Sequence, residues 1–418
     1  MNDLPSRPAV RSVALRQVVI VVLVAVLAGG AGGFALARAT AATCPLNAAA
    51  CAALADFWES WRLAERHFVD PTALDPARMT EGAINGMLAS LGDSGHTAYL
   101  SPAAAALDRE QTSGRFEGIG AYVDVRDEQP LIVEPLEGSP AERAGLRAGD
   151  RILTIDGVAV RGITIDDLRT RLRGPAGSDV VLTVSRDSEA LPREITVTRG
   201  EIRLDSVTWA MLPDLVAHVR ITRFAEQTGA DVRAALVAAR AAGARALIVD
   251  VRNNPGGLVS QLVAVAGEFV PAGTTVMIEQ DRDGASRPYR TTGAGEARDL
   301  PLAILINRNS ASAAEILAAA LRDAGRATLV GEATFGTATV LQPFTLASGA
   351  QLRLAIAQWL TPGGAVVRSR GVAPDVQVVL AAGATPLSPA RAAQLGATVW
   401  QGDDGQLVAA LRVLTARP

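Results

Sequence analysis

The spacing of hydrophobic residues changes twice along this chain, and each change predicts a different kind of structure. Over residues 52–107, apolar side chains recur every three to four positions, which is the period of an amphipathic helix. Over residues 113–200, short β-branched runs alternate with turn residues and predict strands, with one helix near 166–172. After residue 200, fully apolar runs alternate with alanine-rich helical stretches, which is the pattern of an α/β domain.

The N-terminal segment is apolar without any helical or strand alternation. Residues 18–37 are uncharged and cover the length of about 20 residues that crosses a bilayer as a helix. Three arginines precede this segment, so the positive-inside rule predicts a cytoplasmic N-terminus and an extracytoplasmic remainder. Small residues at 35–41 leave open a cleaved signal peptide and a secreted protein in place of a membrane anchor.

Together with the N-terminal segment and the C-terminal tail, the three spacing patterns predict a multidomain α+β protein. The C-terminal tail carries two further helical stretches, at 389–400 and 406–417, whose apolar spacing suits packing on a core. The predicted parts are an N-terminus with a transmembrane or signal segment (1–41), an N-terminal helical region (42–112), a β-rich domain (113–200), an α/β core (201–383) and a C-terminal helical tail (384–418).

Composition narrows the class of protein. The net charge is only −3 and aromatic residues make up 4%, which argues against a nucleic-acid partner. The two cysteines, Cys44 and Cys51, follow the apolar segment, where an oxidising compartment favours a local disulfide. Two cysteines and three distant histidines give no metal-ligand spacing, so we expect neither a metal nor a cofactor.

Two glycine-rich segments stand out in the β-rich region. Residues 138–157 read Gly-Ser-Pro-Ala-Glu-Arg-Ala-Gly-Leu-Arg-Ala-Gly-Asp-Arg-Ile-Leu-Thr-Ile-Asp-Gly, and Phe-Glu-Gly-Ile-Gly-Ala precedes them at 116–121. Both resemble a PDZ domain, so 113–200 is expected to be one. The resemblance implies a carboxylate-binding loop at Gly118 and Gly120, with Ile119 as the floor of a pocket for a peptide's terminal side chain. An ordinary strand-entry turn is the alternative for the two glycines.

A serine follows one of the buried runs of the α/β region. After 302–306 the chain reads Asn-Ser-Ala-Ser-Ala-Ala-Glu at 309–315, and a helix follows. A serine at such a strand-to-helix turn exposes its hydroxyl, and the helix dipole and the following N–H groups face the same point. Ser312 is therefore a candidate nucleophile and Ala313 N–H a candidate oxyanion donor. The alternative, which local sequence alone favours, is a capping box of Ser312 and Glu315.

A glycine turn ends another buried run. Residues 246–251 lead into Arg-Asn-Asn-Pro-Gly-Gly at 252–257. A backbone without side chains lets a reacting carbonyl approach N–H donors, and losing one such donor costs about 3 kcal/mol in other hydrolases. Gly256 and Gly257 are therefore predicted to belong to an oxyanion hole, with a plain strand-ending turn as the alternative.

The order and spacing of these motifs resemble the carboxyl-terminal processing (tail-specific) serine peptidases. Further matching segments extend the resemblance from His67 to Val378, at 91–102, 329–336, 361–364 and 371–375. The resemblance implies a core with a crotonase-like or ClpP-like sheet-and-helix fold. It also implies an endopeptidase that binds protein or peptide substrates with exposed apolar C-termini through its PDZ domain.

The sequence departs from this family at the general base. The family's catalytic lysine directly follows the Phe-Gly of 335–336, where this chain has Thr337, and Leu341 stands at the usual glutamine. The chain has no lysine at all, since its 40 basic residues are all arginine. A threonine hydroxyl is far too weak a base to activate a serine near neutral pH.

Two hypotheses remain for Ser312. In the first, the base is His96, because tricorn-like relatives use a histidine from the segment before the PDZ domain and an imidazole accepts protons near neutral pH. Those relatives orient the histidine with a glutamate, whose place here is taken by Arg368, so Asp93 is the candidate for that role. In the second, the chain is an inactive pseudopeptidase, a membrane-tethered module that binds peptide tails. His67 and His218 are expected to be structural.

Overall fold

The computed structural model describes residues 47–93, 96–186, 189, 191–293, 295–381 and 383–415. The chain divides into two compact units, residues 1–80 and 81–418. The predicted transmembrane or signal segment at 18–37 lies outside the described residues. Every helix within the described stretches is too short or too polar to cross a bilayer.

The first unit is helical over its described part. It holds α2 (Ala48–His67), η1 (Pro71–Ala73) and the start of α3 (Pro76–Ala89). Helix α2 begins four residues earlier than its apolar spacing predicts, because the Asn47 side chain accepts a hydrogen bond from Ala50 N and caps the first turn. Cys51 on this helix is disulfide-bonded, and Cys44 lies outside the described residues.

A small antiparallel sheet occupies the region predicted to be a PDZ domain. Its strands, in the order β3-β4-β5-β7-β8 with β6 beside β5, are β3 (Ala121–Arg126), β4 (Gln129–Pro135), β5 (Arg151–Ile155), β6 (Val158–Ala159), β7 (Asp179–Ser185) and β8 (Arg193–Thr198). Helices α5 (Pro140–Arg143) and α6 (Ile165–Leu172) lie within the same stretch. A separate pair, β2 (Arg115–Gly118) and β9 (Gly200–Arg203), flanks this sheet in the sequence.

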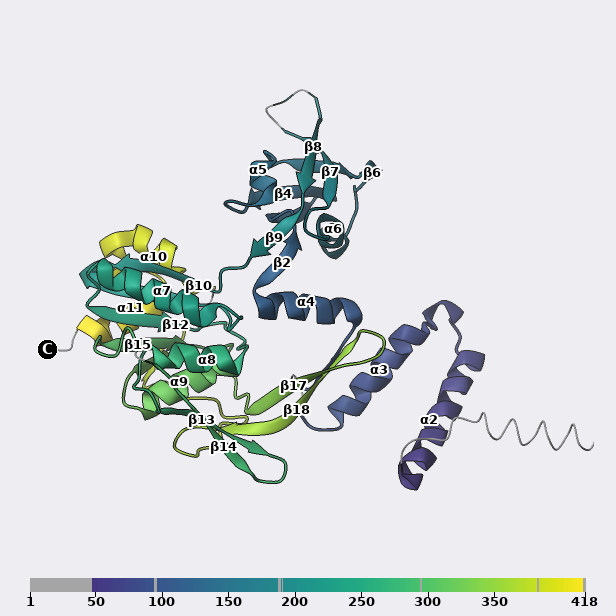
Figure 1. Ribbon diagram of the computed structural model, residues 1–418. Helices are drawn as coiled ribbons and strands as arrows, with labels where there is room; N and C mark the ends of the chain where they lie inside the picture. Colours follow the sequence, from purple (N-terminus) through teal and green to yellow (C-terminus); the bar gives the residue numbers. More distant parts are fainter. Residues whose placement is uncertain are drawn as a thin grey trace, which may run out of the picture. The chain divides into compact units, whose positions relative to one another are not determined.

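The α/β core is built on a six-stranded sheet (Figure 1). Its order is β10 (Val207–Leu212), β11 (Val216–Ile221), β12 (Ala246–Asp250), β15 (Leu302–Ile306), β16 (Thr328–Gly331) and β19 (Val376–Gln377). A short η2 (Pro213–Leu215) joins the antiparallel pair β10–β11, and the remaining neighbours are parallel. The carboxyl ends of β12 and β15, where both predicted site motifs begin, are therefore adjacent.

Both faces of this sheet are buried, which explains why its strands are apolar runs without alternation. Leu247 and Val249 face a cluster that includes α7 (Thr228–Ala241), α8 (Val259–Gly267) and α9 (Ala313–Asp323). Ala246 and Ile248 face a second cluster with α10 (Pro389–Leu395), η3 (Gly396–Gln401) and α11 (Gly405–Thr415). The predicted packing of the C-terminal helices on the core is confirmed.

One predicted helix is interrupted. The stretch at 389–400 was expected to be continuous, yet α10 stops at Gly396, which takes φ 51 and ψ −134 and turns the chain into η3. A left-handed backbone of this kind suits glycine, which has no Cβ.

A second antiparallel sheet carries the segment that contains His96. Its strands are β1 (Ala98–Leu100), β13 (Thr275–Asp281), β14 (Ser286–Arg290), β17 (Thr339–Thr345) and β18 (Gln351–Leu360). Strand β18 pairs with β1, β13 and β17, and the β17–β18 pair forms the long ribbon in Figure 1. Helix α4 (Pro102–Ser113) follows β1 directly.

Candidate active site

Ser312 lies in a strained turn between β15 and α9. Its backbone takes φ 53 and ψ −119. The N-cap serines of α4, α5 and α10 instead have φ between −77 and −56 and ψ between 156 and 163, and each accepts a hydrogen bond through its hydroxyl. A positive φ is costly for a residue with a Cβ and is characteristic of the exposed serine of a nucleophile elbow. The capping box of Ser312 and Glu315 that local sequence favours is present, but the backbone of Ser312 differs from that of the other serine caps.

Glu315 joins this turn to the loop that carries Thr337. Its fully buried carboxylate accepts Ser312 N–H at 2.9 Å and Thr337 N–H at 2.9 Å through the same oxygen, Oε2. The other oxygen accepts Gly336 N–H at 2.7 Å and the hydroxyl of Thr334. Burial raises the pKa of this carboxyl, and these four hydrogen bonds oppose the rise. Glu315 Oε2 thereby bridges the backbone N–H groups of Ser312 and Thr337.

The glycine turn after β12 lies directly against Ser312. A Cβ on Gly256 would come within 2.7 Å of Ser312 Cβ, and one on Gly257 within 2.3 Å of the Phe224 carbonyl oxygen. Both residues have positive φ, 101 and 140, so only glycine fits at either position. The close approach of this turn to the serine was expected from its sequence.

The three predicted oxyanion donors differ in what they bind. Gly256 N–H donates to Asn254 Oδ1 at 2.8 Å and is already occupied. Gly257 N–H and Ala313 N–H have no hydrogen-bond acceptor within the described part of the chain. Gly256 consequently leaves space beside Ser312 because it has no side chain. Gly257 and Ala313 provide the open N–H donors.

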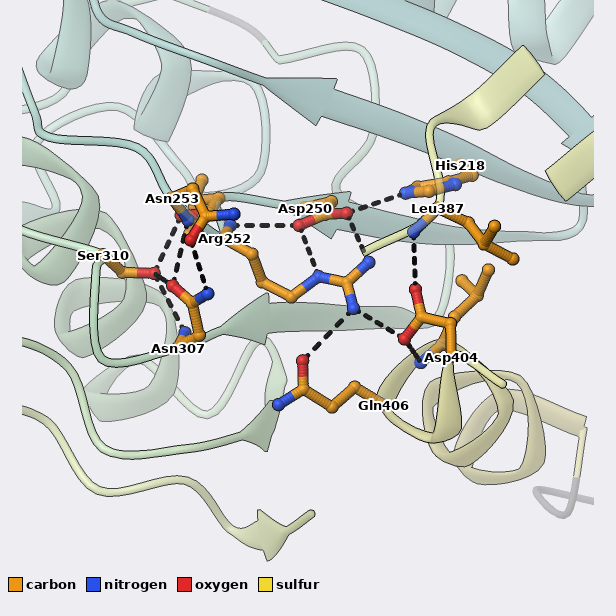
Figure 2. Close-up of polar contacts among 11 residues, drawn as sticks. His218, Asp250, Arg252, Asn253, Asn307, Ser310, Leu387, Asp404 and Gln406 are labelled. Atoms are coloured by element: carbon orange, nitrogen blue, oxygen red, sulfur yellow. Dashed lines mark hydrogen bonds and ion pairs between the residues drawn. The ribbon is translucent and has the colours of Figure 1, made fainter. Parts of the chain in front are cut away.

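Amide side chains tie the two loops together (Figure 2). Asn307 Oδ1 accepts Asn253 N–H at 2.9 Å, and Asn307 Nδ2 donates to Asn253 Oδ1 at 2.8 Å. Ser310 Oγ donates to Val251 O at 2.8 Å. Asn307 and Ser310 are buried and paired, and buried polar groups paired in this way rigidify the backbone around them, so the strained turn has a fixed support.

A buried ionic cluster lies behind the glycine turn. Figure 2 shows the guanidinium of Arg252 between Asp250 and Asp404, with bonds of 2.9 and 2.8 Å to the first and 2.7 Å to the second. Asp250 also accepts a hydrogen bond from His218 Nε2 at 3.2 Å. Burial alone would raise the pKa of Asp250, but the charge of Arg252 and the hydrogen bonds of His218 and Arg252 hold it well below its usual range. His218 lies on β11, as expected, and belongs to this support.

His96 contacts Thr337, the residue predicted to stand at the lysine position. His96 Nε2 and Thr337 Oγ1 are 2.9 Å apart, and the imidazole lies edge-on to Phe335 with ring centroids at 5.6 Å. Asp93 Oδ1 is 3.7 Å from His96 Nδ1, an ion-pair distance rather than a hydrogen bond, and Arg368 Nη2 is 3.5 Å from the same oxygen. His96 and the predicted lysine position, Thr337, are therefore in direct contact.

Ser312 and His96 line one cavity of about 510 Å³. Gly257, Thr337 and Trp359 line it as well, and α4 contributes Asp108 and Gln111. The cavity is large enough for several residues of an extended peptide. His67, by contrast, is an exposed residue at the end of α2, in the first unit.

The predicted peptide loop of the PDZ region also lines a hollow, of about 150 Å³. Ile119 is 3% exposed within it, and Gly120 has φ 74, where a Cβ would meet Ser139 Cβ and Ile202 Cδ1 at 2.6 Å. Gly118 ends β2 just before this loop. Among the described residues there is no cluster of acidic, histidine or cysteine side chains able to hold a metal.

Two parts of the site were not foreseen. Glu315 was considered only as a helix cap. Its place in an apolar stretch without a nearby basic residue was a sequence signal that its carboxylate binds backbone N–H groups. The Arg252–Asp404 pair joins positions 152 residues apart, and nothing in either local sequence indicates the other.

Comparisons with known proteins match two regions of the chain. Residues 215–378 match the model of peptidase family S41, and residues 131–186 match a PDZ domain model. The carboxy-terminal processing protease CtpA of Bacillus subtilis is 33% identical over 306 residues, which are 73% of this chain and 65% of that protein. The match spans just under two thirds of such relatives, 60 to 65% of their length.

Two solved structures are similar to this chain. A photosystem II D1 C-terminal processing protease is 30% identical, with 81% of this chain and 96% of that chain covered and a TM-score of 0.46. An S41 protease from Bacteroides fragilis shares the fold at 18% identity, with 80% and 90% covered and a TM-score of 0.50. The matches define an α/β peptidase-type core combined with a PDZ domain. The chain belongs to peptidase family S41, and its relatives are carboxy-terminal processing proteases.

Proposed function

We propose that this chain is a serine endopeptidase in which Ser312 is the nucleophile. The observation that carries the proposal is the strained backbone of Ser312, at φ 53, directly against a glycine turn that leaves Gly257 N–H open. Strain of this size persists where surrounding contacts enforce it, and here Glu315 and the asparagine network do so. A serine that served only to cap α9 would not need this conformation.

His96 accepts the proton of Ser312 in this proposal. In the resting arrangement its Nε2 faces Thr337 Oγ1, so a rotation of that hydroxyl frees the nitrogen for Ser312. The serine oxygen then attacks the peptide carbonyl, and the proton passes from the imidazolium to the leaving amine. Water hydrolyses the resulting acyl-enzyme by the same route. Asp93, whose Oδ1 is 3.7 Å from Nδ1, takes the role of the group that orients the imidazole.

Gly257 N–H and Ala313 N–H stabilise the developing oxyanion. Both are backbone donors without an acceptor within the described part of the chain, and Ala313 is the first residue of α9. Its position adds the positive end of the helix dipole to the same point. Gly256 allows the carbonyl to approach because it places no side chain beside Ser312.

The remaining parts of the chain bring substrate to this site. The PDZ region binds an unstructured C-terminal tail with an apolar last residue, through backbone donors near Gly118 and Gly120 and the pocket above Ile119. Residues 18–37 anchor the protein in a membrane with the peptidase core on the extracytoplasmic side, or are removed as a signal. Fractionation of cells that express the full chain separates the two.

The test is cleavage of a model protein with an unstructured, apolar C-terminal tail. Ser312→Ala and His96→Gln are each expected to lower kcat/KM at least a thousandfold, because one removes the nucleophile and the other the base. Ser286→Ala, at an exposed position on β14, serves as the control and should match the wild type. Cleavage that survives Ser312→Ala would disprove the mechanism.

Thr337 favours a second candidate, a tail-binding protein without peptidase activity. The residue in the lysine position is neutral, and it occupies the histidine nitrogen that catalysis requires. Tail binding by the wild type together with no cleavage of any tailed substrate would support this candidate.

A further inference from the structure

One end of the active-site cavity carries two arginines and one carboxylate. Arg223 and Arg353 both line the cavity, and Asp108 is the acidic side chain beside them. Burial lowers the pKa of Arg223, Asp108 opposes that effect and Arg353 adds to it, so the three charges lie close enough to act on one another. This end of the cavity therefore has an excess of one positive charge.

Neither guanidinium is saturated by hydrogen bonds. Arg223 Nη2 donates to Gln111 Oε1 at 2.9 Å, and Arg353 Nη1 donates to Asp108 Oδ1 at 3.2 Å. Arg353 Nε is buried without a partner in the described part of the chain. A guanidinium has five N–H donors and suits a carboxylate in a two-bond geometry, so open donors of two arginines face the same space.

A second unpaired group lies further along the cavity. Thr339 is 7% exposed, and its Oγ1 finds no partner among the described residues. A buried hydroxyl left unpaired costs free energy, and Thr339 is one of the residues that line the cavity. The cavity is consequently polar at two places that the proposed chemistry on Ser312 does not use.

The register of β17 and β18 gives the length between these places. Thr339 pairs with Gln358, and Pro343 pairs with Arg353. On β17, four residues at roughly 3.3 Å each separate Thr339 from the position opposite Arg353. An extended peptide covers the same distance in about four residues. Thr339 is two residues from Thr337, whose N–H shares the Glu315 carboxylate oxygen with Ser312 N–H.

We propose that Arg223 and Arg353 bind a carboxylate of the substrate, and that the enzyme selects an acidic side chain about three to five residues from the peptide bond that it cleaves. This specificity rests on the proposed function of Ser312. It differs from recognition of an apolar C-terminus by the PDZ region, because it acts inside the cavity of the peptidase core. The same chemistry suits a terminal carboxylate at that distance, and the experiment distinguishes the two sources.

The experiment measures binding and does not depend on turnover. Full-length Ser312→Ala protein is titrated, by fluorescence anisotropy, with labelled peptides that carry a single Glu at successive positions and a C-terminal amide, and with Gln at the same positions. The amide removes the carboxylate that a PDZ loop binds. A third peptide has a free C-terminal carboxylate and no acidic side chain, and tests the terminal source.

The expected result is a Kd about tenfold lower for Glu than for Gln at one position, since a charge-assisted hydrogen bond is the difference. Arg223→Gln and Arg353→Gln should each remove this preference. Arg282→Gln, at an arginine whose side chain is 90% exposed, should keep it. Thermal unfolding of each variant shows whether it is folded.

The outcomes separate the two proposals. Equal Kd values for Glu and Gln at every position, or a preference that both variants retain, would overturn the arginine site. A preference carried by the terminal carboxylate alone would overturn the choice of an acidic side chain. A Glu preference that both arginine variants lose supports the arginine site. If the wild type also cleaves no substrate, the arginine site stands and the proposed peptidase activity is contradicted.

Discussion

Glu315 organises the candidate site at the scale of single residues. Its two oxygens hold the N–H groups of Ser312, Gly336 and Thr337, so one side chain sets the distance between the nucleophile turn and the lysine position of the family. This arrangement places Thr337 where a lysine would reach the site. We predict that Glu315 would hold the backbone of a lysine at residue 337 in the same way.

This geometry predicts that a lysine can replace the histidine. In a His96→Gln background, which should be inactive, Thr337→Lys is expected to restore cleavage of a tailed substrate at least tenfold, because the amine enters the same cavity. The pH profile should also move to higher pH, since lysine is the weaker acid. Thr337→Val in the same background is the control and should stay inactive. No rescue, with the variant folded, would contradict the equivalence of the two positions.

At the scale of elements, the loop after β12 depends on a helix that comes much later in the chain. Arg252 is completely buried, and its partner Asp404 also caps α11 by accepting Leu407 N–H at 3.1 Å. Gly256, the first glycine of the turn, lies four residues beyond Arg252. The position of the open Gly257 donor therefore rests on helices that cover the opposite face of the sheet.

Removing the charge of Asp404 should consequently affect catalysis and stability together. Asp404→Asn is expected to lower the free energy of unfolding by about 3 kcal/mol, because it leaves the buried Arg252 with one ionic partner fewer. It should lower kcat more than it raises KM, since the oxyanion donor is displaced. Urea unfolding and steady-state kinetics measure the two effects.

Asp403→Asn is the matched control, because Asp403 is the exposed neighbour of Asp404. It should leave both quantities unchanged. A loss of stability in Asp404→Asn with an unchanged kcat would show that the ionic cluster supports the fold alone.

The sequence predicted individual strands and turns better than the contacts between them. Strand β15 was predicted at its observed ends, and the strand-to-helix turn at Ser312 followed from it, because local apolar runs and turn residues carry that information. The site residues themselves stay predictions. The contact of His96 with Thr337 spans 241 positions and depends on a tertiary arrangement that no local pattern contains. Gly256 N–H was expected to be open, and only the structure reveals its bond to Asn254.

At the scale of the whole molecule, buried charge makes stability depend on pH. Asp250 stays ionised in the folded chain because Arg252 and His218 hold its pKa well below its usual range, whereas in the unfolded chain it titrates near pH 3.9. Its contribution to stability is therefore present above about pH 4 and is lost as the pH falls further. The slope is about 1.4 kcal/mol per pH unit for this one group.

Urea unfolding between pH 5 and pH 2 tests this expectation. The wild type should lose stability below about pH 4, and Asp250→Asn, although less stable at pH 7, should show a slope shallower by about 1.4 kcal/mol per pH unit. Asp283→Asn, at a side chain 85% exposed, is the control and should keep the wild-type slope. Equal slopes in all three proteins would refute the depressed pKa of Asp250.

The ion pair of Arg252 and Asp404 also sets an order of events during synthesis. Arg252 leaves the ribosome 152 residues before its partner, and until then the sheet face that α11 covers stays open to water. Contacts of such long sequence separation form late, because the intervening chain must first close. The nascent chain therefore lacks the Arg252–Asp404 ion pair until residue 404 is made. The loop that carries Gly257 therefore gains its full set of buried ionic contacts only after the start of the last helix has been synthesised.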